Sequence, residues 1–246
     1  MVKRALLTFI PWKWTGVVYS LLTSTTGFSR KFRKNKVGSN SYVDPSVQII
    51  GWQNVEIGDN TVLTQDTWLN VKFRDDPEKK ITIGNNCHIG RRNFFSSGPL
   101  ILIKDYCLTS VDCHFLGCGH QLDTPMVPYI VSGPSSGAVI EIGVNCWLAT
   151  SVTVLQGVKI GHGSIIGARS MVTNSIPPFS IAFGNPCKVI KRFDFKNNQW
   201  LLVSEWSDEL EQLIPCEQEY LSQLIKNNNA IQPSLIASSH RFGWLR

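Results

Sequence analysis

An aliphatic residue that recurs every six positions is the feature that most constrains the fold of this chain. Downstream of residue 141 the sequence divides into hexads whose first residue is always Ile, Leu or Val. These first residues are Ile142, Leu148, Val154, Ile160, Ile166 and Val172. The fifth residue of each of these hexads is small or apolar. One hexad is a short strand with a tight turn, and so three hexads make one triangular coil that stacks on the next at about 4.8 Å.

The same register appears upstream, where further sets of hexads start at Ile57, Ile83 and Ile103. The intervals from one start to the next, including that to Ile142, are 26, 20 and 39 residues. They exceed the 18 residues of one coil by 8, 2 and 21. An insertion inside a strand would break the stacking, so we expect these insertions at corners, the longest over about residues 121–140. Ordinary hairpins do not explain the 18-residue recurrence, which predicts an all-β solenoid over residues 37–193.

The charge and the cysteine content favour some classes of function over others. The net charge is +6, but the basic residues gather in two short clusters, residues 30–36 and 188–192, without a recognition helix or aromatic platform. We therefore expect no nucleic-acid partner. The seven cysteines include no Cys-x-x-Cys pair, which favours a reducing compartment and no structural metal. Cys87, Cys107 and Cys146 share the fifth hexad position and should be buried and inert.

The two ends of the chain differ from the repeats. Residues 1–36 form an apolar segment with a basic end, and Pro11 and Lys13 keep its apolar run well below the ~20 residues of a spanning helix. Its aromatic residues suit a peripheral contact with a membrane, and we expect a cytoplasmic protein that touches the inner face of that membrane. The alternative is that the segment packs on its own domain or on a sister subunit. Residues 194–246 carry apolar residues at helical spacing, with Asp208 and Glu209 suited to a helix start. We expect a helical extension there.

Three segments resemble the hexapeptide-repeat acetyltransferases, and most of all their sugar and polysaccharide O-acetyltransferases. The segments are IEIGVNCWLATSVTVLQGVKIGHGSIIGARSMVTNSIPP, FGNPCKVIKRF and HFLGCGHQLDTP. The resemblance covers roughly residues 37–193. It implies a left-handed parallel β-helix, a homotrimer, and acetyl-CoA as co-substrate in the groove between neighbouring subunits. The period alone does not define the handedness.

The resemblance places the general base at His120, which directly precedes the long insertion. A neutral imidazole can accept the proton of an attacking hydroxyl near pH 7, and direct transfer then needs no covalent intermediate. His114, six residues earlier, is more consistent with a structural role or with a contact beside the base. Asp112 and Asp123 are both candidates to orient the imidazole, and the sequence does not choose between them.

Asn93 is the second catalytic candidate, because similar sugar acetyltransferases carry an asparagine about one and a half coils before the base. It would orient the substrate or stabilise charge. The position is uncertain by counting, since Arg92 aligns equally well. Asn93 could instead occupy the inward fifth position of a hexad and fill a turn.

The resemblance also indicates residues for coenzyme A. Ala149 and Ala168 are small enough for pantetheine to approach the backbone, although small residues are also ordinary repeat residues. Trp147 could pack on the cofactor or on a neighbouring subunit. Lys188, Lys191 and Arg192 suit the 3′-phosphate, with plain surface charge as the alternative.

These observations predict an acetyl-CoA-dependent O-acetyltransferase that acts on a sugar hydroxyl of a polysaccharide or oligosaccharide precursor. An N-acetyltransferase acting on an amino-sugar nucleotide is a close alternative. A γ-type carbonic anhydrase is a second, since His88, His114 and His120 could converge on zinc from adjacent subunits. A non-catalytic scaffold trimer is a third. The sequence does not identify the acceptor sugar.

Overall fold

The computed structural model describes residues 36–123 and 125–227. The predicted membrane-contacting segment therefore lies outside the described residues except for its last position, and so do residues 228–246 of the C-terminal extension. Within the described part of the chain, no helix has both the length and the apolar character needed to cross a membrane.

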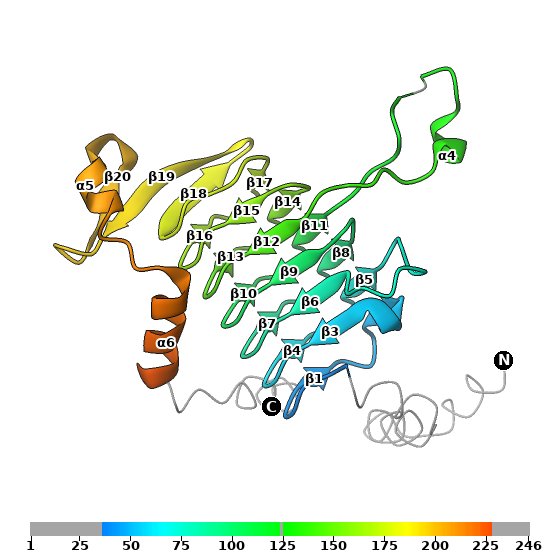
Figure 1. Ribbon diagram of the computed structural model, residues 1–246, viewed down its shortest axis with the longest axis horizontal. Coiled ribbons are helices and arrows are strands. Elements are labelled where there is room, and N and C mark those ends of the chain that lie inside the picture. Colours follow the sequence, from blue (N-terminus) through cyan, green and yellow to red (C-terminus); the bar gives the residue numbers. More distant parts are fainter. Residues whose placement is uncertain (1–35, 124, 228–246) are drawn as a thin grey trace, which may run out of the picture.

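The described chain is a solenoid of three parallel sheets, which we call faces A, B and C (Figure 1). Face A comprises β3 (Val55–Ile57), β6 (Ile81–Ile83), β9 (Ile101–Ile103), β12 (Ile140–Ile142) and β15 (Lys159–Ile160). Face B begins with β1 (Tyr42–Val43), β4 (Val62–Leu63), β7 (His88–Ile89), β10 (Leu108–Thr109), β13 (Trp147–Leu148) and β16 (Ile165–Ile166). Face C comprises β2 (Gln48–Ile50), β5 (Trp68–Asn70), β8 (Phe94–Ser96), β11 (His114–Leu116), β14 (Thr153–Leu155) and β17 (Met171–Val172). The chain visits A, B and C in turn, and each strand pairs with its counterpart one coil away.

The inward aliphatic positions form the core, as the hexads predict. On face A, Ile83, Ile103 and Ile142 lie in register on successive coils, and each is at most 1% exposed. Cys87 and Cys107 are buried at the turn that follows, where burial raises the pKa of both thiols well above the usual range. These thiols are therefore structural rather than reactive.

The corner between faces A and B, which we call corner AB, repeats one left-handed backbone position on every coil. Its φ values run from 50° to 68° at residues Asn40, Asn60, Asn86, Tyr106, Asn145, Gly163 and Phe179. Asparagine and glycine tolerate this conformation, whereas the two aromatic residues adopt it at a steric cost. Both aromatic side chains border the same hollow on face B. The corner between faces B and C, corner BC, has a similar series that includes Arg92 and Asp112.

All three predicted insertions leave at the remaining corner, between faces C and A, which we call corner CA. They occupy residues 71–80, 97–100 and 117–139, between the ends of β5, β8 and β11 and the starts of β6, β9 and β12. The longest, which we call the arm (residues 117–139), is a two-stranded ribbon with α4 (Tyr129–Ser132) near its tip. Its two sides are joined by bonds such as those from Ser135 N to Gly119 O and from Gln121 N to Gly133 O. Figure 1 shows the arm projecting away from the coils.

Three further strands follow the last coil, and the third of them lies within residues 194–246, for which the sequence predicted a helical extension. β18 (Ser180–Gly184) joins face B in parallel, and β19 (Cys187–Asp194) and β20 (Gln199–Leu202) add to it in antiparallel fashion. Phe193 pairs with Trp200, and the aromatic residues of this short hairpin favour strand over helix. Two helices follow, α5 (Asp208–Glu211) and α6 (Glu217–Asn227).

α6 is attached to corner AB by polar contacts. The Glu217 carboxylate accepts a 3.0 Å hydrogen bond from Val144 N and forms an ion pair with Lys104. Tyr220 accepts a hydrogen bond from the Asn145 side chain one turn further along α6. The helix therefore covers the corner next to face B, where it forms one wall of the hollow described below.

Candidate active site

His120 lies at the base of the arm, just beyond corner CA, and its side chain is exposed. The residue forms an antiparallel bridge with Pro134 on the opposite side of the ribbon. The backbone of the arm thus holds the imidazole at the surface, close to the end of β11. This placement suits a general base, which must reach a hydroxyl that arrives from solvent.

The outer surface of face C carries an aromatic ladder at the corner BC ends of its strands. Trp68, Phe94 and His114 lie in register on β5, β8 and β11. The ring centroids of Trp68 and Phe94 are 4.9 Å apart, and those of Phe94 and His114 are 6.4 Å apart. The side chains of Trp68 and His114 are exposed, so the ladder offers flat apolar surface to a ligand.

Asn93 does not lie at this surface, and the prediction that it contacts substrate is wrong for this conformation. Its side chain is 1% exposed, and Nδ2 donates to Gly90 O at 2.7 Å and Ser110 O at 2.8 Å. The strand alternation turns Asn93 inward and Phe94 outward. Asn93 therefore fills the turn, the alternative that the hexad position allowed, and it joins two successive coils.

Asp112 does not orient the His120 imidazole, because its carboxylate bonds Arg92 at corner BC. Arg92 Nε and Nη2 donate to the two carboxylate oxygens, each at 2.8 Å. The side-chain hydrogen bond from Arg92 is the largest cause of the lowered pKa of Asp112. Asp123 is exposed on the arm three residues after His120, and it is still a candidate to orient the His120 imidazole.

Three of the predicted coenzyme A residues gather near corner BC. Ala149 and Ala168 lie just beyond β13 and β16, on successive coils, and are half-buried and exposed respectively. The exposed Lys188 lies opposite Phe183 in the hairpin. Phe183 also borders Gly167, where an added Cβ would lie 2.7 Å from the Phe183 Cβ. The hairpin thus places Lys188 near Ala149 and Ala168.

Trp147 and Lys191 share the outer surface of face B. Trp147, 44% exposed, lies on strand β13 rather than on a corner. The register leads from Trp147 through Ile165 and Ile181 to Lys191. Three strand spacings separate the first residue from the last, which is about 14 Å. Both remain available to a ligand that lies across this face.

Arg192 is not available to a phosphate, which corrects the prediction from its sequence position. It is 5% exposed, and it forms two hydrogen bonds, of 2.8 and 3.2 Å, with the Glu211 carboxylate. The guanidinium carbon lies 4.5 Å from the centre of the Trp206 ring. Alternation along β19 directs Arg192 away from the side that carries Lys191. Its hydrogen bonds to Glu211 instead connect α5 to the hairpin.

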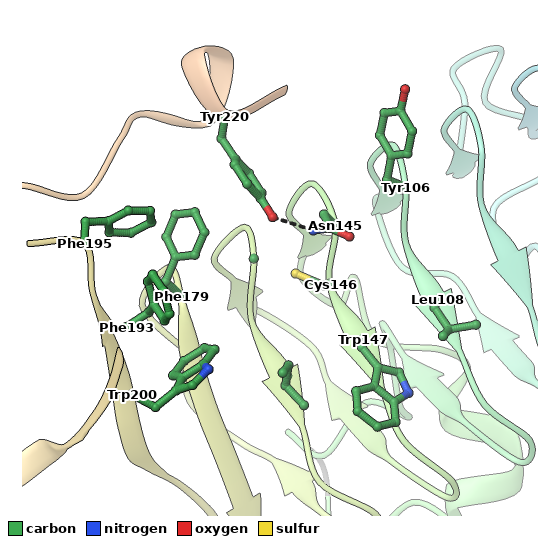
Figure 2. A pocket seen from close by; sticks show the side chains of 12 residues that line it. Tyr106, Leu108, Asn145, Cys146, Trp147, Phe179, Phe193, Phe195, Trp200 and Tyr220 are labelled. Carbon is green, nitrogen blue, oxygen red and sulfur yellow. Dashed lines mark hydrogen bonds between the residues drawn. The ribbon is translucent and has the colours of Figure 1, made fainter. Parts of the chain in front are cut away.

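Face B also carries a hollow of about 520 Å³, which we call the aromatic groove. Its lining includes Tyr106, Leu108, Asn145, Cys146, Trp147, Gly163, Ile165, Phe179, Phe193, Phe195, Trp200 and Tyr220. Figure 2 shows the hairpin aromatics on one side, Trp147 and Leu108 on the other, and Tyr220 reaching from α6 toward Asn145. No sequence pattern predicted this groove, because its walls come from segments about a hundred residues apart. The alternation of Phe193 and Phe195 was the available signal.

A single protomer does not bring His120 together with the coenzyme A candidates. His120 lies at corner CA, whereas Ala149 and Ala168 lie at corner BC. One side of the coil separates the two corners, and six residues of strand span roughly 20 Å. The three histidines of the zinc alternative are also apart, since His88 is on face B and His114 on face C. Among the described residues, no three His, Cys, Asp or Glu side chains are grouped closely enough to bind a metal ion.

No protein-family model matches the chain. A putative acetyltransferase of Staphylococcus aureus is 36% identical over 131 residues, which are 53% of this chain and 64% of that protein. The galactoside O-acetyltransferase of Escherichia coli is 33% identical over 51% of this chain and 63% of its own length. The chain thus spans somewhat less than two thirds of these curated relatives. A probable macrolide acetyltransferase of Lysinibacillus sphaericus is 39% identical over 52% of this chain and 68% of its own length.

Among solved structures, AntD is similar in fold. AntD is an N-acyltransferase from Bacillus cereus, solved in complex with dTDP and 3-hydroxybutyryl-CoA. The match has a TM-score of 0.57 at 19% identity, and it covers 81% of this chain and 96% of AntD. The predicted left-handed parallel β-helix is confirmed. The repeats, the coil architecture and the identity to these relatives agree, and the chain belongs to the hexapeptide-repeat acetyltransferase family.

Proposed function

We propose that this protein is an acetyl-CoA-dependent O-acetyltransferase that acts on a sugar hydroxyl of an oligosaccharide or polysaccharide precursor. The observation that carries the proposal is the exposed His120 at corner CA, which follows face C, the sheet whose outer surface carries the aromatic ladder. The names of the relatives support the reaction class, and one of them is a galactoside O-acetyltransferase.

The chemistry requires one base and one positioned thioester. The neutral His120 imidazole accepts the proton of the sugar hydroxyl. At the same time the hydroxyl oxygen attacks the carbonyl carbon of acetyl-CoA. The C–S bond then breaks, and the proton passes from the imidazolium to the departing thiolate. The products are an acetyl ester and coenzyme A, with no acyl-enzyme between them.

The active site is formed between two copies of the chain, most simply in a homotrimer. Because corners CA and BC are roughly 20 Å apart in one protomer, His120 meets the coenzyme A residues of a neighbour. Acetyl-CoA then lies between adjacent β-helices, along Trp147, Ala149 and Ala168. Lys188 and Lys191 bind its phosphates.

The aromatic ladder gives the acceptor a place to bind. The apolar face of a pyranose ring can pack on Trp68 or Phe94, which lie on the two coils that precede His114. This arrangement favours a sugar acceptor over a small charged one.

The decisive experiment compares His120→Ala with His114→Ala in coenzyme A release with sugar acceptors. Loss of the general base should lower kcat by about 100-fold or more, since positioned bases contribute 10²–10⁴. His114→Ala should mainly raise the KM for the sugar, because that side chain lies in the ladder. Turnover of His120→Ala at the wild-type rate would contradict the proposal. Amino-sugar nucleotides in the same screen test the N-acetylation alternative.

We further propose a cytoplasmic protein whose first 36 residues contact the inner membrane surface. The apolar and aromatic residues beside a basic run support this location. Full-length protein should sediment with anionic vesicles, and removal of residues 1–35 should abolish sedimentation without changing turnover on a soluble acceptor. Equal sedimentation of both forms would contradict it.

A further inference from the structure

One hollow at corner CA is shared by all three insertions, and we call it the insertion pocket. It has a volume of about 520 Å³. Residues 71–80 supply most of its lining, the insertion at residues 97–100 adds Pro99, and the arm adds Ser136. These segments leave from three successive coils, so the pocket lies along the same edge of the stack as His120. None of the residues assigned above to catalysis or to coenzyme A lines it.

The insertion pocket begins close to His120. Pro134 bridges His120 across the ribbon, and Ser136 follows Pro134 by two positions. Two residues of strand span about 7 Å, and the insertion at residues 71–80 leaves two coils away from the arm, about 10 Å along the stack. A glycan whose hydroxyl reaches His120 can therefore place a neighbouring part of its own structure in the pocket.

The insertion at residues 71–80 is tied to the coils by buried polar contacts. Lys80 is 5% exposed and forms a 2.5 Å ion pair with Asp76. The fully buried Asn54 donates from Nδ2 to Asp76 O at 2.5 Å and to Glu78 O at 2.8 Å. These contacts position the insertion before a ligand arrives, which lowers the ordering cost of binding.

The charges that line the insertion pocket are unequal. Lys80 and Asp76 neutralise each other in their ion pair. The side chains of Lys72, Arg74 and Asp75 are exposed, and none of them forms an ion pair with another described residue. Two uncompensated cations therefore line the same pocket as one uncompensated carboxylate. This balance favours an anionic ligand that also offers a hydroxyl donor to the carboxylate.

The lining contains the groups that an acidic sugar requires. The Arg74 guanidinium is planar and matches the oxygens of a carboxylate or a phosphate, and the Lys72 ammonium adds a second positive charge. Asp75 can accept a hydrogen bond from a hydroxyl of the ring. Phe73, half-buried in the lining, offers apolar surface to the ring itself.

We propose that the insertion pocket binds an anionic group of the acceptor, so that the enzyme acetylates a glycan that carries a carboxylate or a phosphate near the acetylated hydroxyl. The inference rests on the proposed function and names the class of acceptor within it. No covalent bond forms or breaks in the pocket. Lys72 and Arg74 bind the anionic group and so orient the acceptor toward His120.

The test is isothermal titration calorimetry of the full-length protein without acetyl-CoA. Digalacturonic acid supplies a carboxylate, a lactose phosphate supplies a phosphate, and lactose is the neutral control. We expect at least one anionic probe to bind about tenfold or more tightly than lactose, and this advantage to shrink as the salt concentration rises. The tighter of the two anionic probes identifies the group that the pocket prefers. If neither binds more tightly than lactose, the proposal is overturned.

Substitutions in the pocket assign the anionic preference to its residues. Lys72→Gln and Arg74→Gln should each weaken binding of the preferred anionic probe by about tenfold and leave binding of lactose within twofold. Lys196→Gln is the matched control, because it removes an exposed cation outside the pocket, and it should change neither affinity.

Two outcomes of the variant series would contradict the proposal. One is an unchanged affinity for the anionic probe in both pocket variants, and the other is an equal loss for lactose, which would indicate a structural effect. The calorimetry needs no catalytic turnover. Failure of the pocket to bind anions and failure of the proposed acetylation are therefore distinguishable.

Discussion

Lys191 and Arg192 are neighbours on β19, yet they face opposite sides of the strand and have different environments. Lys191 is half-buried on the outer surface of face B, in register with Ile181. Arg192 is buried between Glu211 and the Trp206 ring. Of two adjacent cations of similar appearance in the sequence, Arg192 is therefore held by its own chain, and only Lys191 is left for the binding role that we propose.

Replacement of these two residues should separate the two roles. Arg192→Ala removes charged hydrogen bonds and should lower the free energy of unfolding by about 1.5–3 kcal/mol. Lys191→Ala should leave stability unchanged and raise the KM for acetyl-CoA a few-fold. Urea unfolding and steady-state kinetics on both variants check this pair. A destabilised Lys191→Ala with normal KM would reverse the assignment.

Asn93 should behave as a structural residue. Asn93→Ala removes the bonds to Gly90 O and Ser110 O, each buried between coils, and should cost about 1–3 kcal/mol of stability. Because the side chain is inward, kcat of the folded enzyme should stay within a few-fold of the wild-type value. Thermal unfolding and active-site-normalised turnover measure the two effects. A stable variant with strongly reduced kcat would restore the catalytic role.

The attachment of α6 should weaken in acid. Burial raises the pKa of Glu217, but the hydrogen bonds from Lys104 and from Val144 N outweigh it, so the folded-state pKa lies below the ordinary value of 4.5. A lowered folded pKa contributes stability that is present above pH 4.5 and is lost as the pH falls through the folded pKa.

The matched variant isolates this contribution. Glu217→Gln keeps the shape but removes the ionised form, and it should be less stable than wild type at pH 7 and converge with it at acidic pH. Hydrogen exchange of the α6 amides, measured for both proteins across this range, gives the local free energy. A constant difference between the two proteins would show that the Glu217 charge does not hold the helix.

Gly163 should be sensitive to a single methyl group. Its φ is +68°, and an added Cβ would lie 2.4 Å from the Phe179 ring. Gly163→Ala should therefore cost more than the about 1–2 kcal/mol of the left-handed conformation alone. Gly133→Ala is the control, since φ is +75° there and no atom lies within 4 Å. Equal losses of stability in the two variants would exclude the clash with Phe179.

The six-residue spacing of the inward aliphatic positions determines which parts of this protein can be predicted from the sequence alone. Ile83, Ile103 and Ile142 stack because each obeys one local rule, and the same rule places the insertions at corners. The inward direction of Asn93 also follows from its fifth position in a hexad, whereas its catalytic assignment came only from the resemblance. The groove depends on Trp147, Trp200 and Tyr220 meeting from three separate elements, and no local pattern encodes that meeting.

The concentration of every insertion at corner CA leaves the protein with one edge where chain length is free to change. Corners AB and BC repeat on a fixed backbone conformation, and an added residue there would displace all the strands that follow. At corner CA a longer or different ribbon leaves the inward aliphatic column untouched. New acceptor or partner specificity can therefore arise by exchange of that one loop, while the scaffold keeps its geometry.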